Sequence, residues 1–156
     1  SKGLEKVGHQ GTFNANPLSS AAGVATLKMV RDETPTQDAI DTASSIRAKV
    51  NQVFADEGVK WAVYGQFSEL HFFTNPDNID IDPLNFEFMS RKCNFFKKDG
   101  ETVNKFRLGL MVNGVDINGK LAGKVSAVHT EEDVDMTADA VRGALDMLRS
   151  EGALPS

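Results

Sequence analysis

The sequence predicts an α+β fold in which helices pack on one face of a small, mainly antiparallel sheet. Apolar residues at three- and four-residue steps, which are typical of helices, occur before and after the middle of the chain. The middle, from Trp61 onward, is instead rich in aromatic and β-branched residues that favour strands. The chain of 156 residues has no internal repeats or linkers and the size of one ordinary domain. This composition and order are typical of the α+β class.

The first helix is expected to begin at Pro17. Asn16 can accept hydrogen bonds from the free N–H groups of the first turn, and proline at the first helical position loses no bond. The helix continues through "LSSAAGVATLKMV" and ends before Thr34, because the residue that precedes a proline is biased away from helix. Its small residues suit close packing against another element.

A second helix is expected over about residues 36–56. One apolar stripe supports it, formed by Ala39, Ala43, Ile46, Val50 and Phe54. Gly58 is placed to end this helix.

The next stretches predict two strands and a loop. "WAVYGQF" and "LHFFT" read as strands around a turn over residues 65–69, and "NPDNIDIDP" (75–83) as an acidic, solvated loop. Residues 84–98 hold four of the ten phenylalanines, and both a helix and irregular packing remain open there.

The last third of the chain predicts a helix, two strands and a final helix. "TVNKFRLGLMVNG" is helical and ends at Asn113-Gly114, and "VDI" (115–117) and "LAGKVSAV" (121–128) are strand-like around the turn "NGK". Thr130 to Asp133 form a capping-box pattern with acidic residues in the first turn. An apolar stripe follows, with Gly152 after the last turn.

Composition excludes some classes of function. A net charge of −5 and a pI near 5.2 argue against nucleic acid as the main partner. No apolar run could span a membrane, and no secretory signal opens the chain. Cys93 is the only cysteine, so no internal disulfide is possible, and we expect a reducing, cytoplasmic location.

Few side chains have the spacing that catalysis or metal binding requires. His9, His71 and His129 show no metal spacing; we expect His71 to be structural and His129 to order the start of the last helix. Cys93 is expected to be a small buried hydrophobe rather than a nucleophile. We therefore expect no metal site and no catalytic residue in the chain.

The stretch "GHQGTFNANPLSSAAG" (8–23) leaves two interpretations open. Gly8 and Gly11 allow close backbone approach, Thr12 offers an N–H and a hydroxyl, and a helix begins just beyond. These are the parts of a phosphate cradle. A short loop before a capped helix is also common, and these local features taken alone favour that ordinary loop over a phosphate site.

A resemblance to a known family changes this balance. "GTFNANPLSSAAGVATL" and "SAVHTEEDVDMTADAVRGAL" resemble two segments of class III pyridoxal phosphate aminotransferases, in the branch that contains glutamate semialdehyde aminomutase. The two segments occur in the family's order and near its separation, and only residues 75–105 match poorly. The resemblance implies the small C-terminal domain of a fold type I enzyme, with a phosphate-binding loop or arm over residues 1–16 and the small domain over residues 17–156.

The resemblance also implies a cofactor site. Gly11 and Thr12 would bind the phosphate of pyridoxal 5'-phosphate, and His9 and Gln10 would line the same site. In this family the threonine serves the active site of the neighbouring subunit, which implies a homodimer or higher self-association. An anchored phosphate fixes the pyridine ring while bonds at the substrate α-carbon are broken and remade.

The chain also departs from the family pattern. Neither Lys2 nor Lys6 has the glycine-rich context of the family's Schiff-base lysine, so the chain resembles only about the C-terminal third of such an enzyme and is expected to be inactive alone. Leu121 stands where aminomutases carry a glutamate, and Gly8 where they carry a tyrosine. These two differences favour a transaminase-type relative.

Two hypotheses about function follow. In the first, the intact protein is an enzyme that transfers an amino group between a small amino compound and a keto acid or aldehyde, or moves it within one molecule as an aminomutase does. In the second, the chain is a non-catalytic binding or interaction module derived from that domain. The coding sequence upstream of Ser1 distinguishes them.

Overall fold

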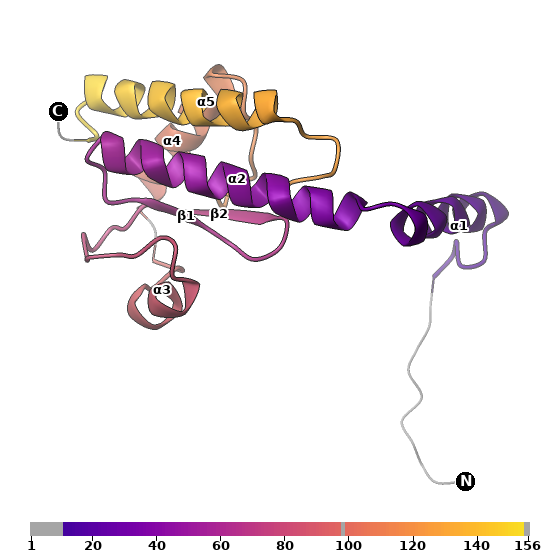
Figure 1. Ribbon diagram of the computed structural model, residues 1–156. Helices are drawn as coiled ribbons and strands as arrows, with labels where there is room; N and C mark the ends of the chain where they lie inside the picture. Colours follow the sequence, from indigo (N-terminus) through magenta and orange to yellow (C-terminus); the bar gives the residue numbers. More distant parts are fainter. Residues whose placement is uncertain (1–10, 98, 155–156) are drawn as a thin grey trace, which may run out of the picture. The chain divides into compact units, whose positions relative to one another are not determined.

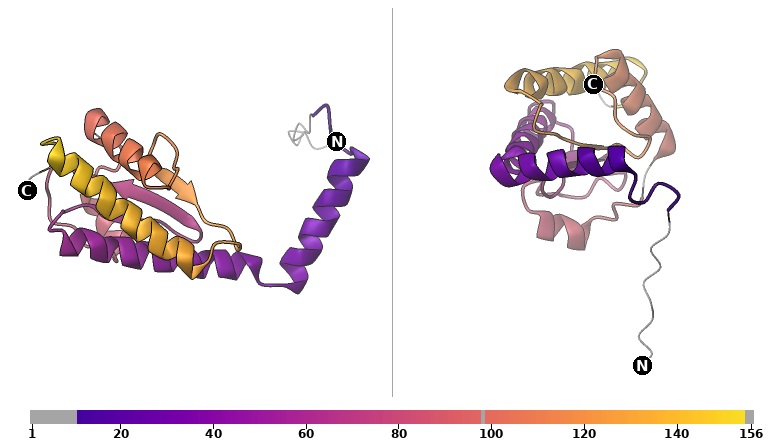
Figure 2. Two further views of the ribbon diagram at one scale, coloured as in Figure 1. Left: turned by 90° about the horizontal axis from the view of Figure 1, so that it is seen from above. Right: turned by 90° about the vertical axis from the view of Figure 1, so that its right-hand side faces the viewer.

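The computed structural model describes residues 11–97 and 99–154 and divides the chain into two compact units. The first unit ends at Thr34 and the second begins at Pro35. Figure 1 shows the order of the elements along the chain, and Figure 2 gives two further views. The functional division expected at residue 16 stays a prediction.

Helix α1 (Pro17–Asp32) belongs to the first unit, and it begins and ends where the sequence predicts. None of its residues is buried. Several of its apolar side chains are largely exposed, namely Leu18, Val24, Leu27, Met29 and Val30. The helix therefore carries large apolar side chains without a core of its own in the first unit.

The second unit combines four helices with a three-stranded sheet. Both neighbouring strand pairs are antiparallel in the order β1-β2-β3, and the register places Tyr64 opposite His71 and His71 opposite Ala122. This confirms the predicted α+β class. In chain order the elements are α2 (Pro35–Asp56), β1 (Ala62–Tyr64), β2 (Glu69–Phe73), α3 (Phe86–Lys92), α4 (Gly100–Val112), β3 (Ala122–Lys124) and α5 (Glu131–Ser150).

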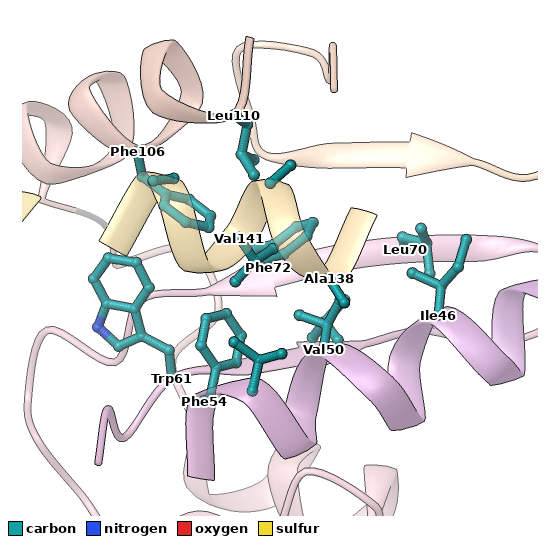
Figure 3. Close-up of a cluster of buried hydrophobic side chains, with 14 of the residues drawn as sticks. Ile46, Val50, Phe54, Trp61, Leu70, Phe72, Phe106, Leu110, Ala138 and Val141 are labelled. Atoms are coloured by element: carbon teal, nitrogen blue, oxygen red, sulfur yellow. The ribbon is translucent and has the colours of Figure 1, made fainter. Parts of the chain in front are cut away.

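One face of the sheet carries the main hydrophobic core. Leu70 and Phe72 of β2 point to this face, where α2, α4 and α5 pack, as Figure 3 shows. The rings of Trp61 and Phe106 meet edge to face with centroids 5.1 Å apart, and Phe72 also contacts Phe106 in an edge-to-face arrangement. The predicted apolar stripe of α2 is confirmed, since all five of its residues are buried and four of them, Ala43, Ile46, Val50 and Phe54, belong to this core.

The opposite face of the sheet carries a second, smaller cluster. It is formed by Ala62, Phe73, Met89 and Cys93, and α3 covers this end of the sheet. Figure 1 shows α3 on the side of the strands away from α2 and α5. Phe95 adds to the cover by stacking on Tyr64, with ring centroids 4.2 Å apart.

Asn51 ties α2 to the edge strand β1. Its side-chain Nδ2 donates to the carbonyl of Val63 and its Oδ1 accepts from the Val63 N–H, each at 2.8 Å. Asn51 is buried, and the amide takes the place that a neighbouring strand would have beside β1. A polar residue on a buried helix face is thereby fully paired.

The prediction of two strands between residues 115 and 128 is wrong in part. Only Ala122–Lys124 forms a strand, and it pairs with β2 rather than with residues 115–117. Arg107 holds the latter segment as a loop, because its Nε donates to the Ile117 carbonyl at 2.7 Å and its Nη2 to Asp116 at 3.2 Å. Side-chain bonds from α4 thus replace the expected ladder.

The signals for the last helix are confirmed. The Thr130 N–H and hydroxyl both donate to the Asp133 carboxylate, at 2.7 and 3.1 Å. Gly152 follows α5 with a φ of 68°, the left-handed conformation that glycine adopts readily. Residues 84–98, left open from sequence, include the short helix α3.

Candidate functional site

Gly11 and Thr12, two of the candidate phosphate-binding residues, lie in a tight turn before α1. The Asn14 N–H donates to the Gly11 carbonyl at 3.2 Å, and the Asn16 N–H donates to the Phe13 carbonyl at 3.1 Å. A Cβ atom on Gly11 would stand 2.5 Å from the Asn14 Oδ1. A side chain at position 11 would therefore require the exposed Asn14 side chain to move.

The N-terminus of α1 itself has few donors left for an anion. The Asn16 side chain accepts from the N–H groups of Leu18 and Ser19, at 3.0 and 3.2 Å. The Ser20 N–H donates to the Asn16 carbonyl, and Pro17 has no N–H. The expectation that the helix end itself attracts the phosphate therefore has no support in this geometry.

Thr12 differs from these capped groups. Among residues 11–97 and 99–154, neither its hydroxyl nor its N–H takes part in a hydrogen bond, and the residue is exposed. A phosphate oxygen could accept from both groups, which fits the predicted role. His9 and Gln10, the other two expected cofactor-binding residues, lie outside the described residues.

The histidines of the second unit have structural partners. The His129 Nδ1 accepts from the backbone N–H of Ser126 at 3.1 Å, and the backbone N–H of His129 donates to the Ser126 carbonyl. His129 therefore orders the loop before α5, as expected. His71 stacks on Tyr64 with centroids 5.4 Å apart, and its Nε2 lies 3.6 Å from a Glu69 oxygen. Neither arrangement resembles a catalytic dyad.

Cys93 is buried, as predicted, and its Sγ lies 3.7 Å from the Met89 Sδ. Burial raises the pKa of the Cys93 thiol. A thiol with a raised pKa is a poor nucleophile near neutral pH.

A groove of about 380 Å³ opens where the α4–β3 loop meets β3 and the start of α5. Its floor is apolar, and Arg107, Lys124 and His129 are among the residues at its rim. Arg107 is bound to Asp116, and Lys124 pairs with Glu69 at 2.7 Å. The rim charges are thus largely paired, and the groove holds no group set up for acid–base chemistry.

Sequence reasoning did not find this groove or the pairing of Arg107. The groove draws on positions from Ile46 to Thr137, and no local pattern brings them together. Arg107 interrupts the apolar run of α4, which was the one local signal available.

Residues 11–97 and 99–154 contain neither a candidate metal centre nor a candidate membrane span. No group of three or more histidine, cysteine or acidic side chains there could hold a metal ion. No helix in that part of the chain is long and apolar enough to cross a membrane.

Comparison with known proteins gives relatives named glutamate-1-semialdehyde 2,1-aminomutase. The chain is 30% identical over 132 residues to a glutamate-1-semialdehyde 2,1-aminomutase of Methanosarcina acetivorans, a match that covers 83% of this chain and 28% of the relative. It is also 30% identical over 142 residues to the enzyme of the same name from Delftia acidovorans, covering 89% of this chain and 30% of that one. The chain thus spans about 30% of the length of these relatives. No family model matches it.

Solved structures agree with the sequence relatives. An omega-transaminase from Sphaerobacter thermophilus is 26% identical, with a TM-score of 0.70 over 92% of this chain and 31% of that one. A glutamate-1-semialdehyde-aminomutase from Pseudomonas aeruginosa is 20% identical with a TM-score of 0.67 over the same shares, and it shows the shared fold. The resemblance to class III aminotransferases is confirmed, and the coverage is consistent with a C-terminal portion of such enzymes.

Proposed function

We propose that this chain is the C-terminal part of a pyridoxal-phosphate-dependent aminotransferase that acts on a small amino compound and a keto acid or aldehyde. The observation that carries the proposal is the match of 83% of the chain to an aminomutase together with the fold shared with an omega-transaminase. The bound cofactor would supply the electron sink at the substrate α-carbon.

Gly11 and Thr12 are the residues of this chain that would hold the cofactor phosphate. The Thr12 hydroxyl and N–H are not bonded within the described residues, and Gly11 beside them adds no side chain. His9 and Gln10 would line the same site. In the homodimer that the resemblance implies, these residues act at the site of the neighbouring subunit.

Transamination is favoured over aminomutation by the residue type at position 121. This residue occupies the position where the aminomutase pattern has a glutamate, and its side chain is fully buried in the main core. A residue that faces the core cannot contact substrate.

The exposed apolar surface of α1 supports a second copy of this chain as its partner. The helix carries five large apolar side chains in solvent and buries none, and such surfaces usually mark contacts.

Sedimentation of the purified chain should show a dimer or larger species. Leu27→Lys should shift it toward the monomer, whereas Thr26→Lys, one residue away on a polar position, should not. A wild-type chain that is monomeric at all concentrations contradicts self-association.

The coding sequence tests the enzyme hypothesis first. A glycine-rich segment with a lysine, encoded upstream of Ser1, is expected. A start codon directly before Ser1 contradicts the enzyme and supports the alternative, a stand-alone interaction module.

A cytoplasmic location, expected from the lone cysteine, also remains part of this proposal.

The second test is the affinity of the full gene product for pyridoxal 5'-phosphate, measured by fluorescence titration. Thr12→Val removes one hydrogen bond to a charged acceptor and should weaken binding by about ten- to a hundredfold. Thr12→Ser keeps the hydroxyl and should bind within a few-fold of wild type. Equal affinity for the Val and Ser variants contradicts the role of Thr12 without touching the enzyme assignment.

A further inference from the structure

Two Asn-Gly pairs flank the segment between α4 and β3, at positions 113–114 and 118–119. In such a pair the backbone nitrogen of the glycine can attack the side-chain amide carbon of the asparagine, because no side chain on the following residue hinders the approach. The two pairs have the same dipeptide sequence, so their surroundings decide which of them reacts.

The surroundings of Asn118 favour this attack. Its Oδ1 accepts hydrogen bonds from the N–H groups of Lys120 and Ala122, at 2.8 and 3.2 Å. Negative charge develops on this oxygen when the amide carbon is attacked, and two fixed N–H donors stabilise it there.

The attacking group is also available. The Gly119 N–H donates to no acceptor among residues 11–97 and 99–154, and a Cβ atom on Gly119 would meet nothing within 4 Å. Both Asn118 and Gly119 are exposed, so water and hydroxide reach them. The loop therefore offers a free nitrogen, a polarised amide and room for the two to approach.

Asn113 and Gly114 are also exposed, but their groups are held by hydrogen bonds and packing. The Gly114 N–H donates to the Met111 carbonyl at 3.1 Å, so its nitrogen is engaged at the end of α4. The Asn113 Nδ2 donates to the Gly109 carbonyl at 2.8 Å, and its Oδ1 lies close against Gly143 of α5. Attack at this site requires the helix end to open first.

We propose that Asn118 is a deamidation site of the folded protein and that Asn113 is protected. The Gly119 nitrogen loses its proton to solvent hydroxide and forms a bond to the Asn118 Cγ. The bond from Cγ to Nδ2 breaks, and ammonia leaves after taking a proton from water. Water then opens the resulting cyclic imide at either carbonyl, which gives aspartate or isoaspartate at position 118.

The isoaspartate product alters the loop that leads into β3. It places an additional carbon in the main chain at position 118, three residues before Leu121, a fully buried residue with a φ of 57°. The Leu121 N–H donates to the Asn118 carbonyl, and the Leu121 carbonyl accepts from the Phe72 N–H, each at 2.9 Å. Position 118 is thus linked through Leu121 to β2.

Peptide mapping tests the proposal. The purified chain is incubated folded in mildly alkaline buffer and digested with trypsin at time points. Both asparagines fall in the tryptic peptide of residues 108–120. Conversion of an amide to a carboxyl group raises the mass of this peptide, and fragmentation spectra show which of the two asparagines carries the increase. We expect Asn118 to react about tenfold faster than Asn113. This is about the factor that breaking one additional hydrogen bond at Asn113 costs before the reaction can occur. Equal rates, faster reaction at Asn113 or no gain at Asn118 would overturn the proposal.

Two controls separate the fold from the sequence. In urea, where the surroundings of both pairs are lost, the ratio of the two rates should fall toward one; a ratio unchanged by unfolding contradicts a structural cause. Gly119→Ala fits the open space at this position and should abolish most of the gain at Asn118 while the circular dichroism spectrum stays unchanged. An undiminished gain in that variant also rejects the mechanism.

Discussion

Gly109 of α4 lies directly against Ala144 of α5. A Cβ atom on Gly109 would stand 2.9 Å from the Ala144 Cβ and 3.0 Å from its Cα, closer than side-chain carbons approach in folded proteins. Helices α4 and α5 therefore touch at a point where only glycine fits.

Gly109→Ala should destabilise the second unit by about 1–3 kcal/mol, because the added methyl group forces the two helices apart. Urea denaturation measures this change. Gly100→Ala, at the start of the same helix in open space, is the matched control and should be neutral or stabilise by up to about 1 kcal/mol. Equal stability of the two variants is the result that contradicts the close contact.

Asn51→Ala should lower the free energy of unfolding by about 2 kcal/mol or more. The substitution leaves the buried N–H and carbonyl of Val63 without partners, and each such group costs about 1–3 kcal/mol. Gln52→Ala, at the next position on the exposed side of α2, should stay within about 0.5 kcal/mol of wild type. The same denaturation curves compare both variants.

Arg47 holds the turn between β1 and β2, where Phe67 has a φ of 51°. Its Nη1 donates to the carbonyls of Phe67 and Glu69, at 3.0 and 2.9 Å. Arg47→Met should therefore speed amide hydrogen exchange in this turn, while exchange in the middle of α5 changes little. Arg142→Met, which removes only an exposed pair with Asp139, should leave the turn unchanged.

The cap of α5 should make stability depend on pH. Hydrogen bonds from the Thr130 backbone N–H and then its hydroxyl lower the pKa of Asp133 from its ordinary value of 3.8. A pKa that is lower in the folded state gives stability that is complete above the unfolded value and is lost as the pH falls through the folded one. Wild type should thus exceed Asp133→Asn in unfolding free energy by a constant amount above about pH 5, and the difference should shrink below pH 4. A difference that does not vary with pH would argue against the cap.

Leu121→Glu restores the residue type of the aminomutase pattern and should unfold the domain rather than create an aminomutase. The fully buried site offers no partner for a carboxylate, so the expected cost is about 3–5 kcal/mol. Leu108→Glu on the exposed side of α4 should change stability by less than about 1 kcal/mol. Thermal unfolding of both variants distinguishes a core position from a site position.

Local signals predicted most of this fold. Asn16 with Pro17, and Thr130 with Asp133, mark the starts of α1 and α5 because capping acts within one turn of helix. Residues 115–117 have strand-like composition, yet Arg107 holds them as a loop. No sequence pattern reports a side-chain bond of that kind, so the strand prediction failed there.

The candidate site was predictable only in its local part. Gly11 and Thr12 are adjacent to the cap that begins α1, so their turn could be inferred from sequence. The pairing of Asn51 with Val63 requires a tertiary contact between a helix and a strand. Such contacts depend on the whole fold and leave no periodic signal.

The second cluster, on the face of the sheet that carries α3, has a consequence for variation among homologous sequences. Its members Met89 and Cys93 contact Ala62 and Phe73 and are separate from the main core. Substitutions of Met89 or Cys93 therefore alter a local cover on one face of the sheet, and the cluster that α2, α4 and α5 form on the other face does not contain them. Variation at these two positions can be absorbed on one side of the sheet.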